Sequence, residues 1–187
     1  MTDVLRRLQQ ALPQVSKWID ELLADHSPTA RPVAGLPFER LGQYFPASLL
    51  RDTRTTTVSA VPFPPVSAYG LPEFEAMANM PMAGITFRDM YFVHESYALE
   101  SIHFHELVHV IQWRVLGFGE FLLTYGAGVV QYGYAESPLE AMAFKFQTEF
   151  ERGTEMAGVS DLVATGALRA RESAAALFQT RGLTIGA

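Results

Sequence analysis

The pattern His105-Glu106-Leu107-Val108-His109 constrains this chain more than any other stretch of the sequence. On an α-helix, His105 and His109 lie one turn apart on the same face, so both imidazoles can reach one metal ion. Glu106 leaves the helix about 100° further round, where it can reach a water molecule beside the metal. This is the H-E-x-x-H arrangement of zinc hydrolases, in which the two His bind Zn²⁺ and the Glu acts as general base.

The residues around this pattern indicate that its helix is buried. Leu107, Val108, Val110 and Ile111 are all apolar. Burying two His and one Glu without partners would cost several kcal/mol, and a bound metal ion removes that cost. With 5 His and 14 Glu in 187 residues, the pattern is expected by chance only about 0.01 times. The alternative, a helix whose His and Glu simply face solvent, does not fit the apolar run.

Composition narrows the class of protein. A chain of 187 residues with 49% hydrophobic and 18% charged residues is typical of one globular domain, expected here to span 1–187. The net charge of −6 and the absence of a basic run argue against nucleic acid and against an anionic membrane as partners. The N-terminus lacks the apolar core of a secretion signal, and no stretch of 18 apolar residues occurs, so we expect a cytoplasmic protein.

The chain contains no Cys. Disulfides, thiolate zinc ligands and Cys nucleophiles are therefore excluded together. Peptide deformylases, which carry H-E-x-x-H but need a Cys as third ligand, are excluded as well. Metzincins continue the pattern with a Gly and a third His, and here Gln112 and Val115 occupy those positions.

The first 80 residues are expected to form N-terminal helices followed by loops and a strand. Hydrophobic periodicity predicts one or two helices over 3–25, with Pro13 suited to the first turn of the second helix. The further expectations are a loop over 26–37, a short helix over 38–45, a strand over 55–61 and a short helix over 71–77.

Residues 84–152 are expected to form the core around the metal site. The pattern predicts a bent strand or a hairpin over 84–93, whose edge could hold an extended peptide. The metal helix is expected over 96–116, with Ser96 as N-cap and Gly117 as its stop. A helix over 120–131, a connector over 132–136, a helix from Ser137-Pro138 to about Arg152 and a last helix over 160–180 follow. The predicted fold class is α+β, mainly helical, with a small sheet edge packed beside the metal helix.

A catalytic zinc usually has three protein ligands and a water, so a third ligand is needed. His103, His94 and His26 have no suitable geometry relative to His105, which leaves a carboxylate from a later helix. Glu140, one turn into its helix, is favoured over Glu136 in the connector because a rigid element can hold a ligand in place. Two alternatives stay open: Glu136 could be the ligand with Glu140 as its partner, or Glu140 could fold back on Ser137 in a capping box.

The sequence also resembles a family of small bacterial zincin-like metallopeptidases of the gluzincin type. The family pattern is roughly H-E-L-x-H-V-x-Q, then Phe-Leu and Tyr on a helix, then G-Y-x-x-x-P-x-E-x-E-A. The matching residues are 105–113, Leu116-Gly117, Phe121-Leu122, Tyr125, Gly133-Tyr134, Pro138-Leu139-Glu140 and Ala143, with Met142 in place of the second Glu. The resemblance covers residues 84–150. It implies a minimal zincin-like fold with Glu140 as third ligand.

The sequence thus predicts a zinc-dependent metallopeptidase acting on a peptide or protein substrate. Zn²⁺ on His105, His109 and Glu140 would activate water, and Glu106 would take its proton. Tyr134, just before the Glu140 helix, is the first choice for a donor to the oxyanion, ahead of Tyr132 and Tyr125. The alternatives are a zinc-binding, catalytically idle domain that serves in regulation or protein–protein interaction, and a metal-free helical scaffold.

Overall fold

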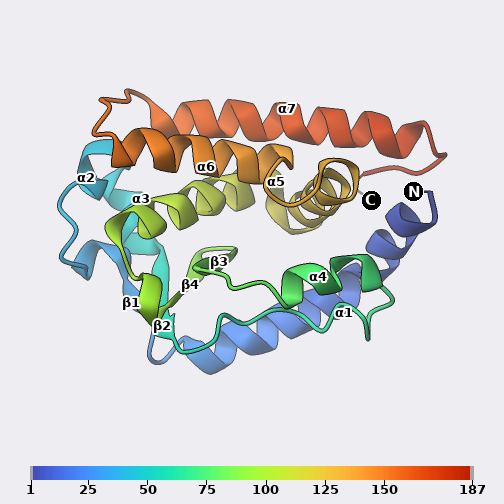
Figure 1. Ribbon diagram of the computed structural model, residues 1–187, viewed down its shortest axis with the longest axis horizontal. Helices are drawn as coiled ribbons and strands as arrows, with labels where there is room; N and C mark the ends of the chain where they lie inside the picture. Colours follow the sequence, from blue (N-terminus) through green and yellow to red (C-terminus); the bar gives the residue numbers. More distant parts are fainter. Residues whose placement is uncertain (1, 186–187) are drawn as a thin grey trace.

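The computed structural model describes residues 2–185 as a mainly helical α+β structure, which confirms the predicted fold class. Figure 1 shows α5 between the strands and the pair α6 and α7, while α1 runs across the opposite face of the sheet. The elements in chain order are α1 (Thr2–His26), β1 (Arg31–Pro32), α2 (Leu41–Tyr44), α3 (Ala47–Asp52), β2 (Arg54–Val58), α4 (Glu75–Ala78), β3 (Gly84–Phe87), β4 (Met90–His94), α5 (Glu100–Tyr132), α6 (Pro138–Glu151) and α7 (Val159–Gln179).

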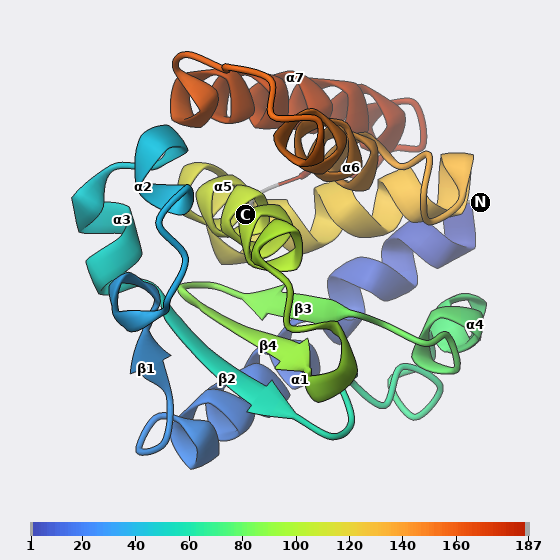
Figure 2. The same cartoon turned by 60° about the vertical axis from the view of Figure 1, so that its left-hand side comes forward.

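The sheet is mixed, with the strand order β1-β2-β4-β3. β3 and β4 form an antiparallel hairpin, one of the two forms predicted for residues 84–93, with Thr86 opposite Tyr91. β2 pairs parallel to β4. Arg88 adopts a φ of 56° at the turn, as tight two-residue hairpin connections require. Because β3 is last in the strand order, it is an edge strand, and Figure 2 shows it lying beneath α5.

α1 is one helix and not two, because Pro13 lies inside it. A proline inside a helix removes one backbone hydrogen bond and costs about 3 kcal/mol. One buried apolar face continues across the proline, and edge-to-face packing of Trp18 on Phe87 fixes the helix against the sheet, with ring centroids 5.5 Å apart. Burial of this face outweighs the local cost. Its buried members are Leu5, Leu8, Ala11, Val15 and Ile19.

α5 is the central helix, and its predicted start at Ser96 was wrong. It begins at Glu100 after the N-cap Leu99, because Ser96 lies in a short 3₁₀ turn where its N–H donates to His94 Nδ1 at 3.1 Å. The predicted interruption at Gly117 is confirmed. That residue has φ 71° and ψ 176°, which are not helical values, so α5 consists of two helical segments joined by a kink, and the second segment continues to Tyr132.

Two glycines in the second half of α5 allow close packing. A Cβ on Gly126 would lie 2.8 Å from a methyl carbon of Leu8 in α1, and one on Gly128 would lie 3.0 Å from Cδ of Pro138. These residues weaken an isolated helix by up to about 1 kcal/mol each. Here they bring α1 and the start of α6 against α5.

The helices α6 and α7 match the sequence prediction closely. Ser137 is the N-cap of α6 and Pro138 its first residue, and α7 covers almost the predicted range. Two short elements, β1 and α3, lie where the sequence predicted loop or nothing at all. Within residues 2–185, none of the helices combines the length and the apolar character needed to cross a bilayer.

Candidate metal centre

The first half of α5 carries the predicted polar triplet on a buried segment. His105, Glu106 and His109 are 7%, 3% and 5% exposed, and the apolar residues between them lie in the core. The spacing of one helical turn brings the two imidazoles together, with their Nε2 atoms 3.0 Å apart. The burial inferred from the apolar neighbours is confirmed.

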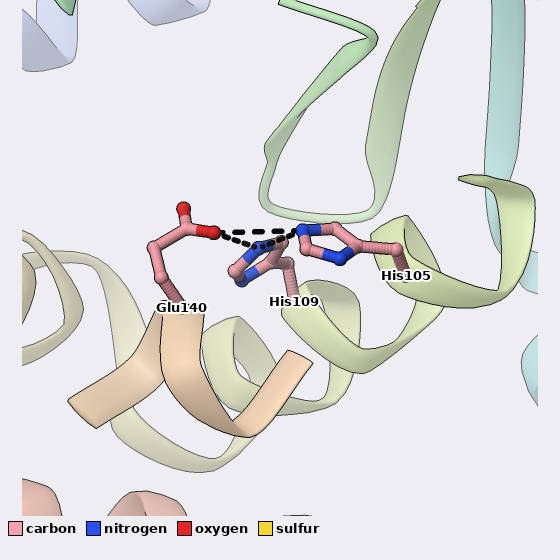
Figure 3. Close-up of side chains that lie close together, drawn as sticks. All are labelled: His105, His109 and Glu140. Carbon is pink, nitrogen blue, oxygen red and sulfur yellow. Dashed lines mark hydrogen bonds and ion pairs between the residues drawn. The ribbon is translucent and has the colours of Figure 1, made fainter. Parts of the chain in front are cut away.

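Glu140 approaches the two imidazoles from α6. Its Oε2 lies 3.5 Å from Nε2 of His105 and 3.5 Å from Nε2 of His109. Figure 3 shows the carboxylate and both rings pointing toward one another from two helices. All three ligand atoms lie within 4.8 Å of one another, and all three residues are buried, so the group could hold a metal ion.

The alternatives to Glu140 do not match the structure. Glu136 is exposed in the connector before α6 and is outside the cluster. Glu140 is not part of a capping box, because the Ser137 N–H donates to the Tyr134 carbonyl at 3.2 Å. The Glu140 carboxylate instead accepts a hydrogen bond from Tyr125 at 2.6 Å on Oε1, which leaves Oε2 facing the histidines.

Gln112 fixes the tautomer of His109. It is fully buried, and its Nε2 donates to the Leu139 carbonyl at 3.0 Å, with Met142 Sδ a further 3.6 Å contact. The amide oxygen must therefore face His109, where it lies 2.8 Å from Nδ1. An oxygen can only accept, so Nδ1 carries the proton and Nε2 of the neutral ring presents a lone pair.

Gln147 fixes the tautomer of His105. Its Nε2 donates to a carboxylate oxygen of Glu151 at 2.9 Å, which orients the amide. Oε1 then lies 3.0 Å from Nδ1 of His105 and accepts its proton. Metal-bound His residues commonly donate their second N–H to such an oxygen, which sets the orientation of the ring.

Three lone-pair atoms thus converge where a cation is required. Two imidazole nitrogens and Glu140 Oε2 face one another, and Oε2 has no hydrogen-bond partner among the described residues. A buried carboxylate oxygen without a donor is costly, and two lone pairs at 3.0 Å repel. A divalent ion on two His nitrogens and one Glu oxygen satisfies all three, and this donor set is that of a catalytic zinc site.

Without a metal, a proton takes the place of that cation. Burial alone lowers the pKa of His109, but the carboxylates of Glu140 and Glu106 and the bond to Gln112 together raise it to about 9. Burial likewise raises the pKa of Glu140, but the two imidazoles outweigh it and hold that pKa well below its usual range. The metal-free cluster at neutral pH is therefore an imidazolium–carboxylate pair.

Glu106 lies against the edge strand β3. Thr86 Oγ1 donates to its Oε2 at 2.7 Å, and the Thr86 carbonyl accepts from Trp113 Nε1 at 3.1 Å. Oε1 has no hydrogen-bond partner among residues 2–185, and a Cβ on Gly84 would lie only 2.5 Å from it. Burial raises the pKa of Glu106 despite the two nearby imidazoles. Gly84 therefore leaves the space in which this oxygen can meet a small molecule.

A cavity of about 320 Å³ opens beside the cluster, and Glu106, Glu140, Tyr125 and Tyr134 all line it. The three tyrosines named from the sequence differ in position. Tyr125 is bonded to Glu140, Tyr132 is 51% exposed at the end of α5, and Tyr134 is half-buried in the cavity wall. Burial, followed by the Glu140 charge, raises the pKa of Tyr134 above its usual range, so its hydroxyl stays protonated.

The remaining histidines lie apart from the cluster, as expected. His103 is buried on another face of α5, where its Nδ1 lies 2.8 Å from the Tyr91 hydroxyl, and burial lowers its pKa to about 4. His26 packs edge-to-face on Phe92, and His94 caps a short turn.

Sequence reasoning missed four residues of this site: Gln112, Gln147, Thr86 and Gly84. For the two glutamines a signal was present. Gln112 follows His109 by three positions, so it shares a helix face with the residue it supports. Gln147 follows Glu140 by seven positions, so it lies on the face of α6 that also carries Glu140 toward His105. Thr86 and Gly84 carry no such signal, because their role depends on where the hairpin packs.

Comparisons with models of known protein families, with curated proteins and with solved structures found no match to this chain. The case for a function therefore depends on the residues of the site.

Proposed function

We propose that this chain is a zinc-dependent peptidase that uses Glu106 as its general base. The observation that carries the proposal is the convergence of three possible metal-ligand atoms, on His105, His109 and Glu140, beside a buried carboxylate with one free oxygen. A metal site that served only to stabilise the fold would have no use for that carboxylate. Structural zinc sites are also closed by four protein ligands, whereas three ligands leave a position open.

The chain supplies the proton transfers from defined atoms. Zn²⁺ on the three ligands would lower the pKa of its water to about 7 and polarise a carbonyl group. Glu106 lines the cavity and would receive the water proton at Oε1, the oxygen to which Thr86 does not donate, while Thr86 holds Oε2 in place. The same carboxyl group then acts as a general acid and delivers the proton to the leaving amine.

The edge strand β3 offers backbone groups for an extended peptide. The Ala83 carbonyl accepts from His94 N–H at 2.8 Å, so Ala83 faces β4. Backbone groups alternate in an antiparallel pair, which turns those of Gly84 and Thr86 away from β4. The Thr86 carbonyl is already bonded to Trp113. The Gly84 N–H and C=O and the Thr86 N–H are left to pair with a substrate strand beside Glu106.

Tyr134 remains our choice for the donor to the oxyanion. It lines the same cavity as Glu106, and its raised pKa keeps the hydroxyl proton available at neutral pH. Removing one such donor typically slows turnover about 100- to 1000-fold. Tyr134→Phe should therefore lower kcat while leaving zinc content unchanged.

The proposal is tested with three proteins: wild type, Glu106→Gln and Glu136→Gln. Each is loaded with zinc, analysed for metal by elemental analysis and incubated with a peptide library whose products are read by mass spectrometry. We expect one zinc per chain in all three. Hydrolysis should be lost in Glu106→Gln and kept in Glu136→Gln, whose exposed carboxylate lies outside the cluster.

Two outcomes would contradict the proposal. Fully metallated wild type without any turnover would instead support a zinc-binding domain that recognises a partner. Wild type that takes up no zinc would support a metal-free scaffold.

A further inference from the structure

The cavity beside the cluster extends well beyond the reacting atoms into an apolar chamber. Figure 2 shows α1, α4 and the yellow second half of α5 gathered at the same side of the molecule, and these elements form the chamber wall. Representative wall residues are Leu8 and Leu12 of α1, Met77 of α4, and Phe121 and Leu122 of α5.

Polar groups gather at only one end of this space. Among residues 2–185, four side chains that line this space have ordinary pKa values below 8. They are the cluster residues His105, His109 and Glu140 and the neighbouring Glu106. The chamber wall beyond them holds no charge that could pair with a charged substrate group. A charged or strongly polar group placed there would lose its hydration without gaining a partner. The chamber therefore selects an apolar occupant.

The size of the space indicates more than a methyl group or a small side chain. The whole cavity, including the part beside the cluster, has a volume of about 320 Å³, at the lower end of the range of roughly 300–1,000 Å³ for pockets that enclose a whole small ligand. A peptide backbone cannot fill the chamber, because each buried N–H and C=O would need a partner that this apolar wall does not provide. A long side chain without polar atoms meets both conditions.

We infer that the substrate residue beside the scissile bond carries a bulky apolar side chain, aromatic or long aliphatic, which is seated in this chamber. The inference rests on the proposed peptidase function and adds a specificity to it. The backbone of the substrate stays at β3 next to Glu106, and only its side chain passes between α1 and the second half of α5.

The first experiment measures hydrolysis by the zinc-loaded protein of peptides that differ only in the residues flanking the scissile bond. One missing methylene in an apolar pocket lowers kcat/KM by about 10- to 200-fold. Replacing Phe or Leu by Ala should therefore lower kcat/KM at least about tenfold, and Lys or Glu should abolish cleavage.

A matched pair of variants tests the chamber itself. Leu122→Trp fills it, because Leu122 lines the wall, whereas Leu162→Trp makes the same change on α7, where Leu162 is 54% exposed. Leu122→Trp should remove the preference for Phe over Ala, while Leu162→Trp should keep it. A Leu122→Trp protein that folds, binds zinc and still prefers Phe would overturn the inference.

A binding measurement separates this inference from the peptidase proposal. Saturation-transfer NMR on the metal-free protein should detect N-acetyl-phenylalanine amide in the chamber and not N-acetyl-lysine amide, with the signal lost in Leu122→Trp. Selective binding without hydrolysis by the metallated protein would refute the peptidase and leave the chamber specificity standing. Hydrolysis without side-chain preference would keep the peptidase and refute the chamber specificity, and so would equal binding of the two amides.

Discussion

Metal binding by this cluster should depend steeply on pH, because the metal has to displace a proton. In the metal-free protein His109 has a pKa of about 9, and its two ring nitrogens then face Gln112 and Glu140. Below that pKa the ring is protonated, and Zn²⁺ binds only after the Nε2 proton has left. The apparent affinity therefore rises as pH rises, and it levels off once pH exceeds the pKa.

The magnitude follows from the pKa of about 9. Each pH unit below the pKa costs about 1.4 kcal/mol, or a factor of about ten in affinity. At pH 7, about two units below, zinc should bind about 100-fold more weakly than its limiting affinity. Between pH 7 and pH 8.5 the affinity should rise about 25-fold, with about one proton released per zinc bound.

The assay is competition with a chromophoric chelator of known pH dependence, together with calorimetry in two buffers that differ in protonation enthalpy. The buffers report the number of protons released. Glu136→Gln is the control, because its carboxylate is exposed and outside the cluster, and it should follow wild type at every pH. An affinity that stays constant between pH 7 and 8.5, with no proton released, would refute the assignment of a proton to His109.

Three substitutions separate metal binding from catalysis. Gln112→Met leaves the buried His109 N–H and the buried Leu139 carbonyl unpaired. Zinc affinity, measured by chelator competition, should fall about 10- to 100-fold. The free energy of unfolding of the metal-free protein, measured in urea, should fall by about 1–3 kcal/mol. Thr86→Val removes the O–H that holds Glu106; kcat should fall about 10- to 100-fold, the equivalent of about 1.5–3 kcal/mol, and a loss of zinc instead would contradict the role given to Thr86. Gly84→Ala would place a Cβ 2.5 Å from Glu106 Oε1 and should lower turnover with zinc retained, whereas Gly42→Ala, with no atom within 4 Å, should match wild type.

The sequence could predict those parts of the site whose geometry is set by a single helical turn. His105, Glu106 and His109 need only a helix to acquire their relative positions, and their apolar neighbours indicated burial. Glu140 was a harder case. Its place on the first turn of α6 could be predicted from Ser137-Pro138, but its approach to α5 depends on how the two helices pack, which is why Glu136 stayed an alternative.

Local signals predicted some features and left others open. Gly117 correctly indicated that helical geometry is interrupted at this position. Pro13 left open whether one helix or two form, and a continuous buried face keeps α1 in one piece. Thr86 reaches Glu106 only because the hairpin packs on α5, and no spacing along the sequence encodes that contact.

The chamber wall contributed by α1 has a consequence for how this protein could diversify. Leu8 and Leu12 line the chamber proposed to receive a substrate side chain, while the candidate metal ligands and the proposed base belong to α5 and α6, about a hundred positions later in the chain. Exchanges on the inner face of the first helix could retune selectivity and leave the reacting atoms untouched. Recognition and chemistry are in this sense separately adjustable, which makes α1 the natural place to begin redesigning what the protein accepts.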